Sequence, residues 1–478
     1  MPTPIDARLS RLQTQVTEAG LDGWLVYDFR GSNPFAARLL GLPTGLHLTR
    51  RYFVWVPREG RPAVLHNAIE GGNWKRITAG SDVETVSCAG HAQMQAALEA
   101  RVRPGMRAAM EYSARCAVPY VSRVDAGTVE QVRALGAEVA SSADLMQEHL
   151  VWSDEDLAAH LVAADAVVAA RDAGFRLIHD RLRAGEPVDE LSVQAAIMAV
   201  FAERGLESDH PANVSFGAHA ADPHHAPNAD DNPALAPGQC VLIDLWAQVP
   251  GRPYADITWM GCAGEPSSEL VRIWEAVRDA RDAAVSLLAG GYKGREGWEA
   301  DRAARAVLDG AGLGQAFTHR LGHSLGTLAV HGDAVNLDDF EAHDTRKLIP
   351  GIGVTIEPGA YLPERAIGVR TEVNVYFAHT GEATVTTPLQ RNLLVLARAT
   401  GTTRWPARTA TPNAAAPPPP SRVRRRRSSR PGRRRGGSGS ASGRPGAGTV
   451  RSGRSPSPCW RPGSTPRRSG RPGHCPGT

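Results

Sequence analysis

Apolar and polar positions alternate differently in the first part of the chain than in the rest. In residues 7–19, Leu9, Leu12 and Val16 recur at helical spacing, and the pattern stops at Gly20. Three short apolar runs that are typical of buried strands follow, with the sequences GWLVYD, RYFVWVP and RPAVLHN. This mixture of helix and strand patterns predicts an α/β domain over residues 1–150.

The part from residue 151 to about residue 400 begins with a long amphipathic helix. The segment SDEDLAAHLVAADAVVAARDAGFRLIHDRL opens with Ser153 and Asp156 in a variant of the capping box, and its apolar residues follow one face. An order of two helices followed by strands then occurs twice along the chain. This repetition predicts two units of paired helices and sheet that pack together, with a site between them.

Charge is distributed very unevenly along the chain. The formal net charge is +4, yet residues 401–478 hold eighteen of the 54 basic residues and none of the 50 acidic ones. The first 400 residues therefore carry 36 basic and 50 acidic residues, a net charge near −14. Nucleic-acid binding rests on basic surfaces that neutralise phosphates, so this acidic part argues against a nucleic-acid partner and suits a site lined by carboxylates.

The last part of the chain has a different composition. It includes the stretch NAAAPPPPSRVRRRRSSRPGRRRGGSGSASGRPGAG. Too few apolar residues are present to form a core, so we expect residues 401–478 to be a disordered tail rich in Arg, Pro, Gly and Ser. Three interpretations stay open: an unstructured tail, a basic arm that contacts nucleic acid or membrane, and an altered reading frame appended to a complete domain.

Cysteine usage and apolar segments indicate the cellular compartment. The six cysteines lack the CxxC spacing of metal sites, and the four in the first 400 residues are too few for a disulfide scaffold. The N-terminus MPTPIDARLSRLQTQ has no apolar signal region, and no apolar run approaches the roughly 18 residues that span a bilayer. We therefore expect a cytoplasmic protein with no membrane partner.

Four apolar segments each carry one carboxylate within a predicted strand. Asp244 lies in VLIDLWA, Asp256 in PYADITW, Glu357 in GVTIEPG and Glu372 in VRTEVNV, where Arg370 precedes Glu372 by two residues on the same strand face. Any one of these carboxylates could form a salt bridge or lie at an exposed edge. Because charged groups are rarely buried without a partner, the four together favour a shared metal site.

A histidine-rich stretch lies between the two pairs of carboxylates. The sequence THRLGHSLGTLAVHG contains His319, His323 and His331, and Gly322 and Gly326 allow backbone to approach a ligand near His323 closely. With His323, the chain offers five ligands, more than one Zn²⁺ uses and enough for two divalent ions if carboxylates bridge them. Oxygen-rich ligation favours Mn²⁺, with Co²⁺, Fe²⁺ or Zn²⁺ as alternatives.

Taken in order, the motifs VLIDLWA, YADITW, HRLGHSLG, TIEPG and VRTEVNV resemble those of the pita-bread metallopeptidases, which include Xaa-Pro aminopeptidase, prolidase and methionine aminopeptidase. The N-terminal part is similar to that of prolidase and creatinase, so the resemblance covers roughly residues 1–400. It implies an α+β chain with a creatinase-like α/β domain over residues 1–150 and a pita-bread catalytic domain over residues 151–400, followed by the tail.

The resemblance also implies a role for each ligand. Asp244 would bind one metal ion and His323 and Glu357 the other. Asp256 and Glu372 would bridge the two ions. Glu357 would in addition shuttle a proton during hydrolysis.

Histidines outside the ligand set would act on the substrate. The loop AADPHHAPNADDNP resembles the family's loop with a substrate-facing histidine, which here is His224, with His225 as the alternative. One of His331 and His224 would stabilise the carbonyl oxygen, and the other would hold the substrate. We expect His319 and Arg370 to orient ligands or line the pocket.

Two departures from the family pattern affect the pocket. His331 follows His323 by eight residues, one more than the family pattern has. Trp259 stands where many members carry an arginine, which leaves the polarity of the substrate open.

The resemblance implies a dinuclear metal-dependent peptidase, acting as a homodimer, that hydrolyses the N-terminal Xaa-Pro bond of dipeptides or short peptides through a metal-bridging hydroxide. One alternative keeps the site but changes the substrate, as in creatinase or dimethylsulfoniopropionate lyases of similar fold. Another is a non-catalytic binding protein, as in histone chaperones of this fold, although five intact ligands argue against it.

Overall fold

The computed structural model of the protein describes residues 3–43 and 45–397. The disorder expected for residues 401–478 lies outside these residues. Among the described residues, helix α1 starts earlier than the periodicity predicts, at Pro4, because Thr3 and Asp6 form a capping box at its N-terminus. No helix in the described ranges is both long enough and apolar enough to cross a membrane.

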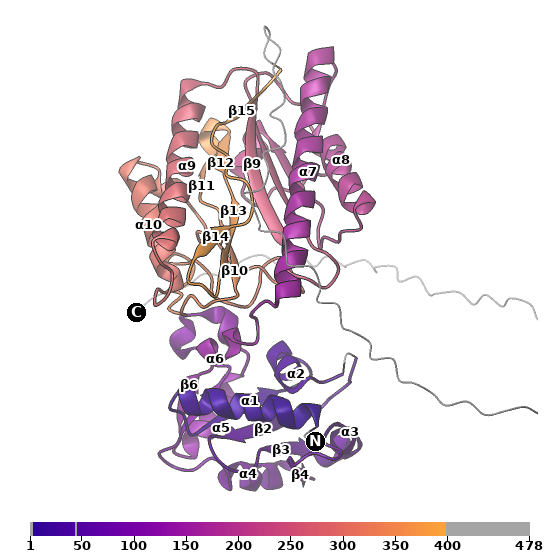
Figure 1. Ribbon diagram of the computed structural model, residues 1–478, viewed down its shortest axis with the longest axis vertical. Coiled ribbons are helices and arrows are strands. Elements are labelled where there is room, and N and C mark those ends of the chain that lie inside the picture. Colours follow the sequence, from indigo (N-terminus) through magenta and orange to yellow (C-terminus); the bar gives the residue numbers. More distant parts are fainter. Residues whose placement is uncertain (1–2, 44, 398–478) are drawn as a thin grey trace, which may run out of the picture. The chain divides into compact units, whose positions relative to one another are not determined.

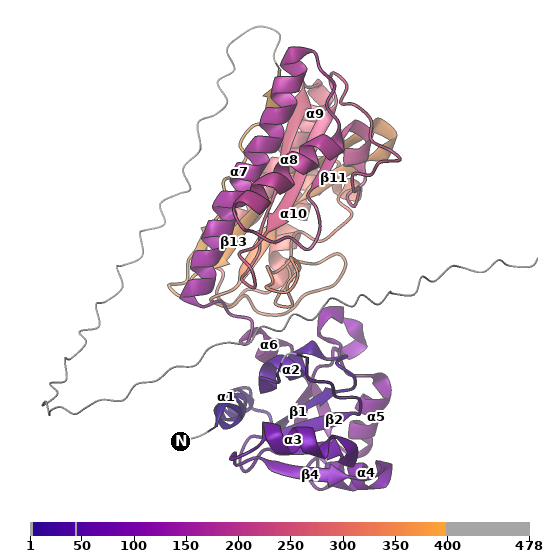
Figure 2. The same ribbon diagram turned by 90° about the vertical axis from the view of Figure 1, so that its right-hand side faces the viewer.

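The N-terminal part is built on a six-stranded sheet in the order β4-β3-β2-β1-β5-β6 (Figures 1 and 2). β1 pairs antiparallel with β2 and parallel with β5, and the three predicted strands correspond to β1, β2 and β3. Separate apolar clusters lie on the two faces of the sheet, one with α1 and α2 and the other with α4 and α5. The elements are α1 (Pro4–Glu18), β1 (Gly23–Asp28), α2 (Pro34–Leu40), β2 (Tyr52–Pro57), β3 (Ala63–Asn67), α3 (Gly71–Ile77), β4 (Glu84–Cys88), α4 (His91–Glu99), β5 (Arg107–Met110), α5 (Ala126–Ala134), β6 (Glu138–Ser141) and α6 (Ala143–Gln147).

The second part contains the repeated order of two helices and then strands that the sequence predicts. In Figure 1, α7 and α8 lie on one side of the strands and α9 and α10 on the other. The first unit comprises α7 (Asp154–Ala184), α8 (Glu190–Glu203), β7 (Asn213–Phe216), the 3-10 turn η4 (Gly217–Ala221), β8 (Cys240–Ala247) and β9 (Ala255–Ala263). The second comprises α9 (Ser268–Ala289), α10 (Gly297–Gly310), β10 (Gly353–Ile356), β11 (Gly359–Leu362), β12 (Ile367–Arg370), β13 (Val373–Phe377), β14 (Ala383–Val385) and β15 (Leu394–Leu396).

The sheets of this part are arranged around β8 and β9. The sheet β15-β9-β8-β7 packs one face against α7 and α8, where Ile243, Ile257 and Trp259 join the apolar core. A three-stranded sheet, β10-β13-β14, and the hairpin of β11 and β12 belong to a second core with α9 and α10. Because side chains alternate along a strand, the other face of β8 and β9 is left for the residues between these apolar positions, which include Asp244 and Asp256.

Candidate metal centre

Strands β8 and β9 place two aspartates on the same face of their sheet. In the antiparallel register, Asp244 lies opposite Thr258, and Asp256 lies opposite Trp246. The backbone of Asp256 is fixed by Asn374, whose side chain accepts from its N–H at 3.0 Å and donates to its carbonyl oxygen at 2.6 Å. The position of this carboxylate therefore depends on the strand pairing and on an amide from β13.

Glu357 and Glu372 reach the same region from turns. We expected both to lie within strands, and this is wrong: β10 ends at Ile356, and Glu372 falls between β12 and β13. Pro358 has no N–H and cannot continue the ladder beyond Glu357. The two backbones are held by other elements, because the Glu357 N–H donates to the Leu321 carbonyl at 2.8 Å and the Glu372 N–H donates to the Thr258 carbonyl at 3.1 Å.

His323 faces this group of carboxylates with a single ring nitrogen. Its Nδ1 lies 3.0 Å from the Ser324 carbonyl oxygen, an arrangement in which Nδ1 carries the proton and donates it. Nε2 then presents its lone pair toward Asp256 Oδ2 at 3.6 Å and Glu357 Oε1 at 3.4 Å. Metal-binding histidines are commonly oriented by such a bond to a carbonyl.

Three of the five expected ligands converge closely. One ligand atom each from Asp256, His323 and Glu372 lies within 4.8 Å of the other two, and all three residues are buried. Asp256 Oδ1 and Glu372 Oε1 are buried without a hydrogen-bond partner. Because an unpaired buried carboxylate oxygen is costly, these two atoms fit a cation that binds between them.

The protonation of the group also suits a cation. Burial, together with the neighbouring carboxylates, raises the pKa values of Asp256 and Glu372 well above the ordinary range. Burial raises the pKa of Glu357 to about 7. Burial lowers the pKa of His323 well below its usual value, so its imidazole is neutral and able to ligate. A cation between these oxygens would favour their ionised forms, which burial without a cation disfavours.

Asp244 has different partners from the other carboxylates. Its Oδ2 accepts from Arg370 Nη2 at 2.5 Å, and its Oδ1 accepts from the Thr258 hydroxyl at 3.1 Å. Arg370 also donates to Thr258 Oγ1 at 3.1 Å and to the hydroxyl of Tyr361 at 3.1 Å. Arg370 thus lies beside the expected ligands and contacts the Asp244 carboxylate.

The other histidines lie at increasing distance from the ligands. The rings of His323 and His331 are 4.1 Å apart between centroids. His319 Nε2 lies 2.8 Å from the Tyr361 hydroxyl, so it reaches Arg370 through the tyrosine. His224 is exposed, whereas the adjacent His225 has Nε2 at 2.8 Å from Glu190.

Trp259 does not line this site. It lies on the opposite face of β9 from Thr258, in the core with α7, and the Arg171 guanidinium stacks on its ring at 3.8 Å from the centroid. The expectation that Trp259 bears on the polarity of the substrate is therefore wrong, because neighbouring residues of a strand point to opposite faces.

Some residues of the site escaped the sequence interpretation. The Thr258 hydroxyl lies 2.8 Å from Glu372 Oε2, and the Thr355 hydroxyl donates to Glu357 Oε1 at 3.1 Å and accepts from the His323 N–H at 2.9 Å. Threonine is common in strands for its shape alone, so its presence carries little signal. The one available clue is that Thr258 shares the strand face of Asp256.

Comparisons with known proteins agree with this geometry. The model of metallopeptidase family M24 matches residues 159–378. A protein named probable dipeptidase PepE from Mycobacterium tuberculosis is 31% identical over 222 residues, which are 45% of this chain and 56% of that protein. The matched part thus spans little more than half the length of this relative.

Solved structures share the fold over most of the chain. The crystal structure of dipeptidase PepE from Mycobacterium ulcerans has a TM-score of 0.59 at 24% identity and covers 83% of this chain and 100% of that one. The Xaa-Pro dipeptidase from Bacillus anthracis has a TM-score of 0.54 at 23% identity and covers 82% and 99%. The family match shows that residues 159–378 form a domain of metallopeptidase family M24, and with the shared fold it confirms the resemblance to the pita-bread metallopeptidases that the order of the motifs predicts.

Proposed function

We propose that the protein is a peptidase that requires two divalent metal ions and hydrolyses the N-terminal Xaa-Pro bond of dipeptides or short peptides. The observation that carries this proposal is the convergence of Asp256, His323 and Glu372, with two carboxylate oxygens that are buried and unpartnered. The family match and the names of the similar proteins support peptide substrates.

The proposed ligand set is the one that the resemblance implies, and the convergence of three of its members supports it. Asp244 would hold one ion, His323 and Glu357 the other, and Asp256 and Glu372 would bridge them. When bound, the ions supply an activated water and polarise the scissile carbonyl. The preference for Mn²⁺ rests on the oxygen-rich ligands. We also propose that the protein is a homodimer, as the resemblance implies. Its proposed cytoplasmic location rests on the cysteine usage and on the N-terminal sequence.

Glu357 is the residue proposed to move the proton. Its Oε1 lies 3.4 Å from His323 Nε2, so the carboxylate is beside the atoms that would hold the ions and can take a proton from the attacking water and return it to the leaving amine. Thr355 donates to Oε1 at 3.1 Å, so Oε2 is the atom that would receive the proton. Arg370 holds the Asp244 carboxylate and so acts on the reaction through that residue.

Two histidines are proposed to contact the peptide. His331 lies beside His323 and is exposed, so it can donate a hydrogen bond to the carbonyl oxygen at which negative charge develops. His224 lies on an exposed loop whose Pro223 carbonyl accepts from Arg370 at 3.4 Å, and it would hold the substrate. Trp259 gives no support to a non-peptide substrate, because it packs in the core with α7 and does not line the site.

The test is hydrolysis of Ala-Pro, Met-Ala-Ser and a longer Xaa-Pro peptide by the full chain, stripped with chelator and reloaded with Mn²⁺. We expect chelator-sensitive release of the first residue from the Xaa-Pro peptides. The Asp256→Asn variant is the matched control, since it keeps the shape but removes a bridging charge. Turnover by the stripped enzyme would contradict the metal requirement, and no turnover with two ions bound would favour a non-peptide substrate.

A further inference from the structure

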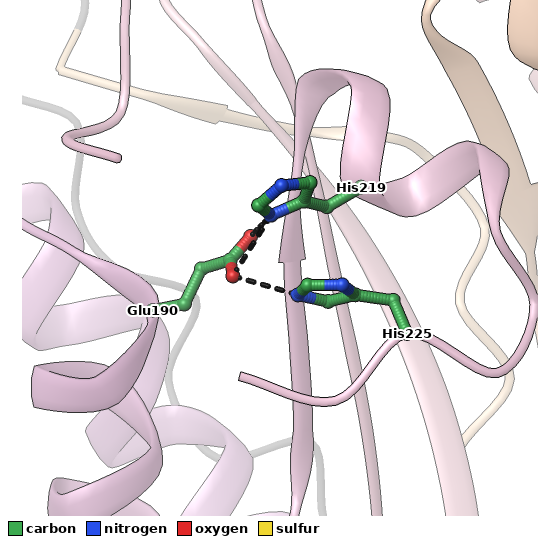
Figure 3. Close-up of side chains that lie close together, drawn as sticks. All are labelled: Glu190, His219 and His225. Atoms are coloured by element: carbon green, nitrogen blue, oxygen red, sulfur yellow. Dashed lines mark hydrogen bonds and ion pairs between the residues drawn. The ribbon is translucent and has the colours of Figure 1, made fainter. Parts of the chain in front are cut away.

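A second group of potential ligands lies apart from the five already described. It consists of Glu190, His219 and His225, whose side chains point toward one another in Figure 3. Glu190 is the first residue of α8, and its side chain is completely buried. His219 belongs to η4, and His225 lies four residues beyond the end of that turn. The group therefore joins a helix to the loop that carries His224.

The potential ligand atoms of these three residues already lie within 4.8 Å of one another. His219 Nδ1 lies 2.9 Å from Glu190 Oε1 and 3.1 Å from Oε2, and His225 Nε2 lies 2.8 Å from Oε2. Tetrahedral ligands at the usual Zn–N and Zn–O distances are about 3.3 Å apart. The two imidazole rings are stacked, with centroids 4.1 Å apart and an interplanar angle of 26°, so one ring would have to turn about its side-chain bonds for both nitrogens to point at one ion.

The surroundings orient these ligands. The Phe216 N–H donates to Glu190 Oε1 at 2.6 Å, which holds the carboxylate and leaves Oε2 toward both histidines. Asp231 Oδ2 lies 3.3 Å from the other ring nitrogen of His219. A carboxylate on the second nitrogen is the usual way in which a metal-binding histidine is oriented.

Access to the group is also present. The side chains of His219 and His225 are 18% and 11% exposed, so an ion can reach them from solvent although Glu190 is buried. Three protein ligands leave further positions for water, as in open zinc sites.

We propose that Glu190, His219 and His225 form a third cation site, separate from the dinuclear centre and selective for Zn²⁺ over Mn²⁺. Two imidazoles and one carboxylate are a nitrogen-rich set that suits Zn²⁺, Ni²⁺ or Cu²⁺, whereas the centre with four carboxylates suits Mn²⁺. An ion at this site would tie the loop of His224 to α8.

The experiment is a Zn²⁺ titration of the full chain whose centre has been loaded with Mn²⁺, followed by elemental analysis after dialysis against micromolar Zn²⁺. We expect one Zn²⁺ per chain in addition to the retained Mn²⁺. The variants His219→Asn and His225→Ala should bind this Zn²⁺ at least tenfold more weakly and keep their Mn²⁺. His219→Asn keeps an N–H donor to Glu190, so it tests ligation with little change to the fold.

His210→Ala serves as the control, because the side chain of His210 is 76% exposed and lies outside the group. It should bind Zn²⁺ as the unmodified protein does. Equal Zn²⁺ binding by the unmodified protein and His219→Asn, with thermal unfolding unchanged, would overturn the proposal, as would no Zn²⁺ beyond that which displaces Mn²⁺. Because the readout is metal content, inactivity toward peptides would refute the proposed function and leave this site intact.

Discussion

The Thr258 hydroxyl contacts Arg370 and two of the proposed ligands at once, and we expect its loss to weaken metal binding. Thr258 is completely buried. Its oxygen accepts from Arg370 Nε at 3.1 Å and lies 2.8 Å from Glu372 Oε2 and 3.1 Å from Asp244 Oδ1. Thr258→Val keeps the branched shape and removes this oxygen, so a buried guanidinium N–H loses its acceptor and one of the two carboxylates loses the single proton that the hydroxyl can donate.

The size of the effect follows from these contacts. Hydrogen bonds to charged groups contribute about 1.5–3 kcal/mol each, so the loss of two lowers the free energy of unfolding by about 3 kcal/mol or more. Groups that orient metal ligands typically affect metal affinity by about 10–100-fold. Thr258→Ser keeps the hydroxyl and removes one methyl group, which costs about 1 kcal/mol and should leave metal affinity nearly unchanged.

The comparison of these two variants separates orientation from packing. Mn²⁺ affinity is measured by calorimetric titration of the stripped proteins, and the free energy of unfolding is measured in urea. We expect Thr258→Val to bind Mn²⁺ at least tenfold more weakly than Thr258→Ser. Equal affinity in the two variants would refute the idea that this hydroxyl orients Glu372 and Asp244.

Other substitutions test the ligand roles, the buried acid of the N-terminal sheet and the face of β9. Asp256→Ala and Glu372→Ala should lose both metal ions, whereas His224→Ala should keep both ions and hydrolyse peptides more slowly. Metal content is measured by elemental analysis, and two ions in Asp256→Ala would contradict the bridging role. Burial raises the pKa of Glu111 to about 7. Its contribution to the free energy of unfolding is therefore full below pH ~4.5 and falls by about 3 kcal/mol as the pH rises through 7. Urea unfolding at pH 5 and pH 8 should show this difference in the unmodified protein and not in Glu111→Gln. Trp259→Leu removes the contact with a guanidinium and should lower the free energy of unfolding by about 2 kcal/mol, with KM unchanged because the ring faces α7; a raised KM would place it in the pocket.

Sequence periodicity was enough to predict the strands that carry the two aspartates. The period of two in VLIDLWA and ADITW places Asp244 and Asp256 at alternate positions among apolar residues, and the structure has both on the face away from α7. The same alternation shows that Trp259 belongs to the opposite face, which follows from its distance of three residues from Asp256. Many family members carry an arginine in place of Trp259, and this comparison wrongly suggested that Trp259 bears on the substrate.

Contacts between distant segments could not be predicted in this way. Glu357 and Glu372 are held by carbonyls of Leu321 and Thr258, which lie 36 and 114 residues earlier in the chain. The group of Glu190, His219 and His225 could not be predicted from the sequence either. An acidic residue in the first turn of a helix is already explained by the helix dipole, so Glu190 alone gives no reason to expect a binding site. Only the packing of α8 beside η4 shows that this glutamate faces two imidazoles.

The balance of charge at the centre gives a reason for the position of Arg370. Four carboxylates would balance two divalent ions, so the positive charge of the buried guanidinium would balance the hydroxide that the proposed reaction uses. In a buried region this charge is poorly screened, and it favours a negatively charged group close to the ions. At the proposed centre that group would be the hydroxide itself, so Arg370 beside Asp244 favours the ionised form of the water without bearing on the length of the substrate.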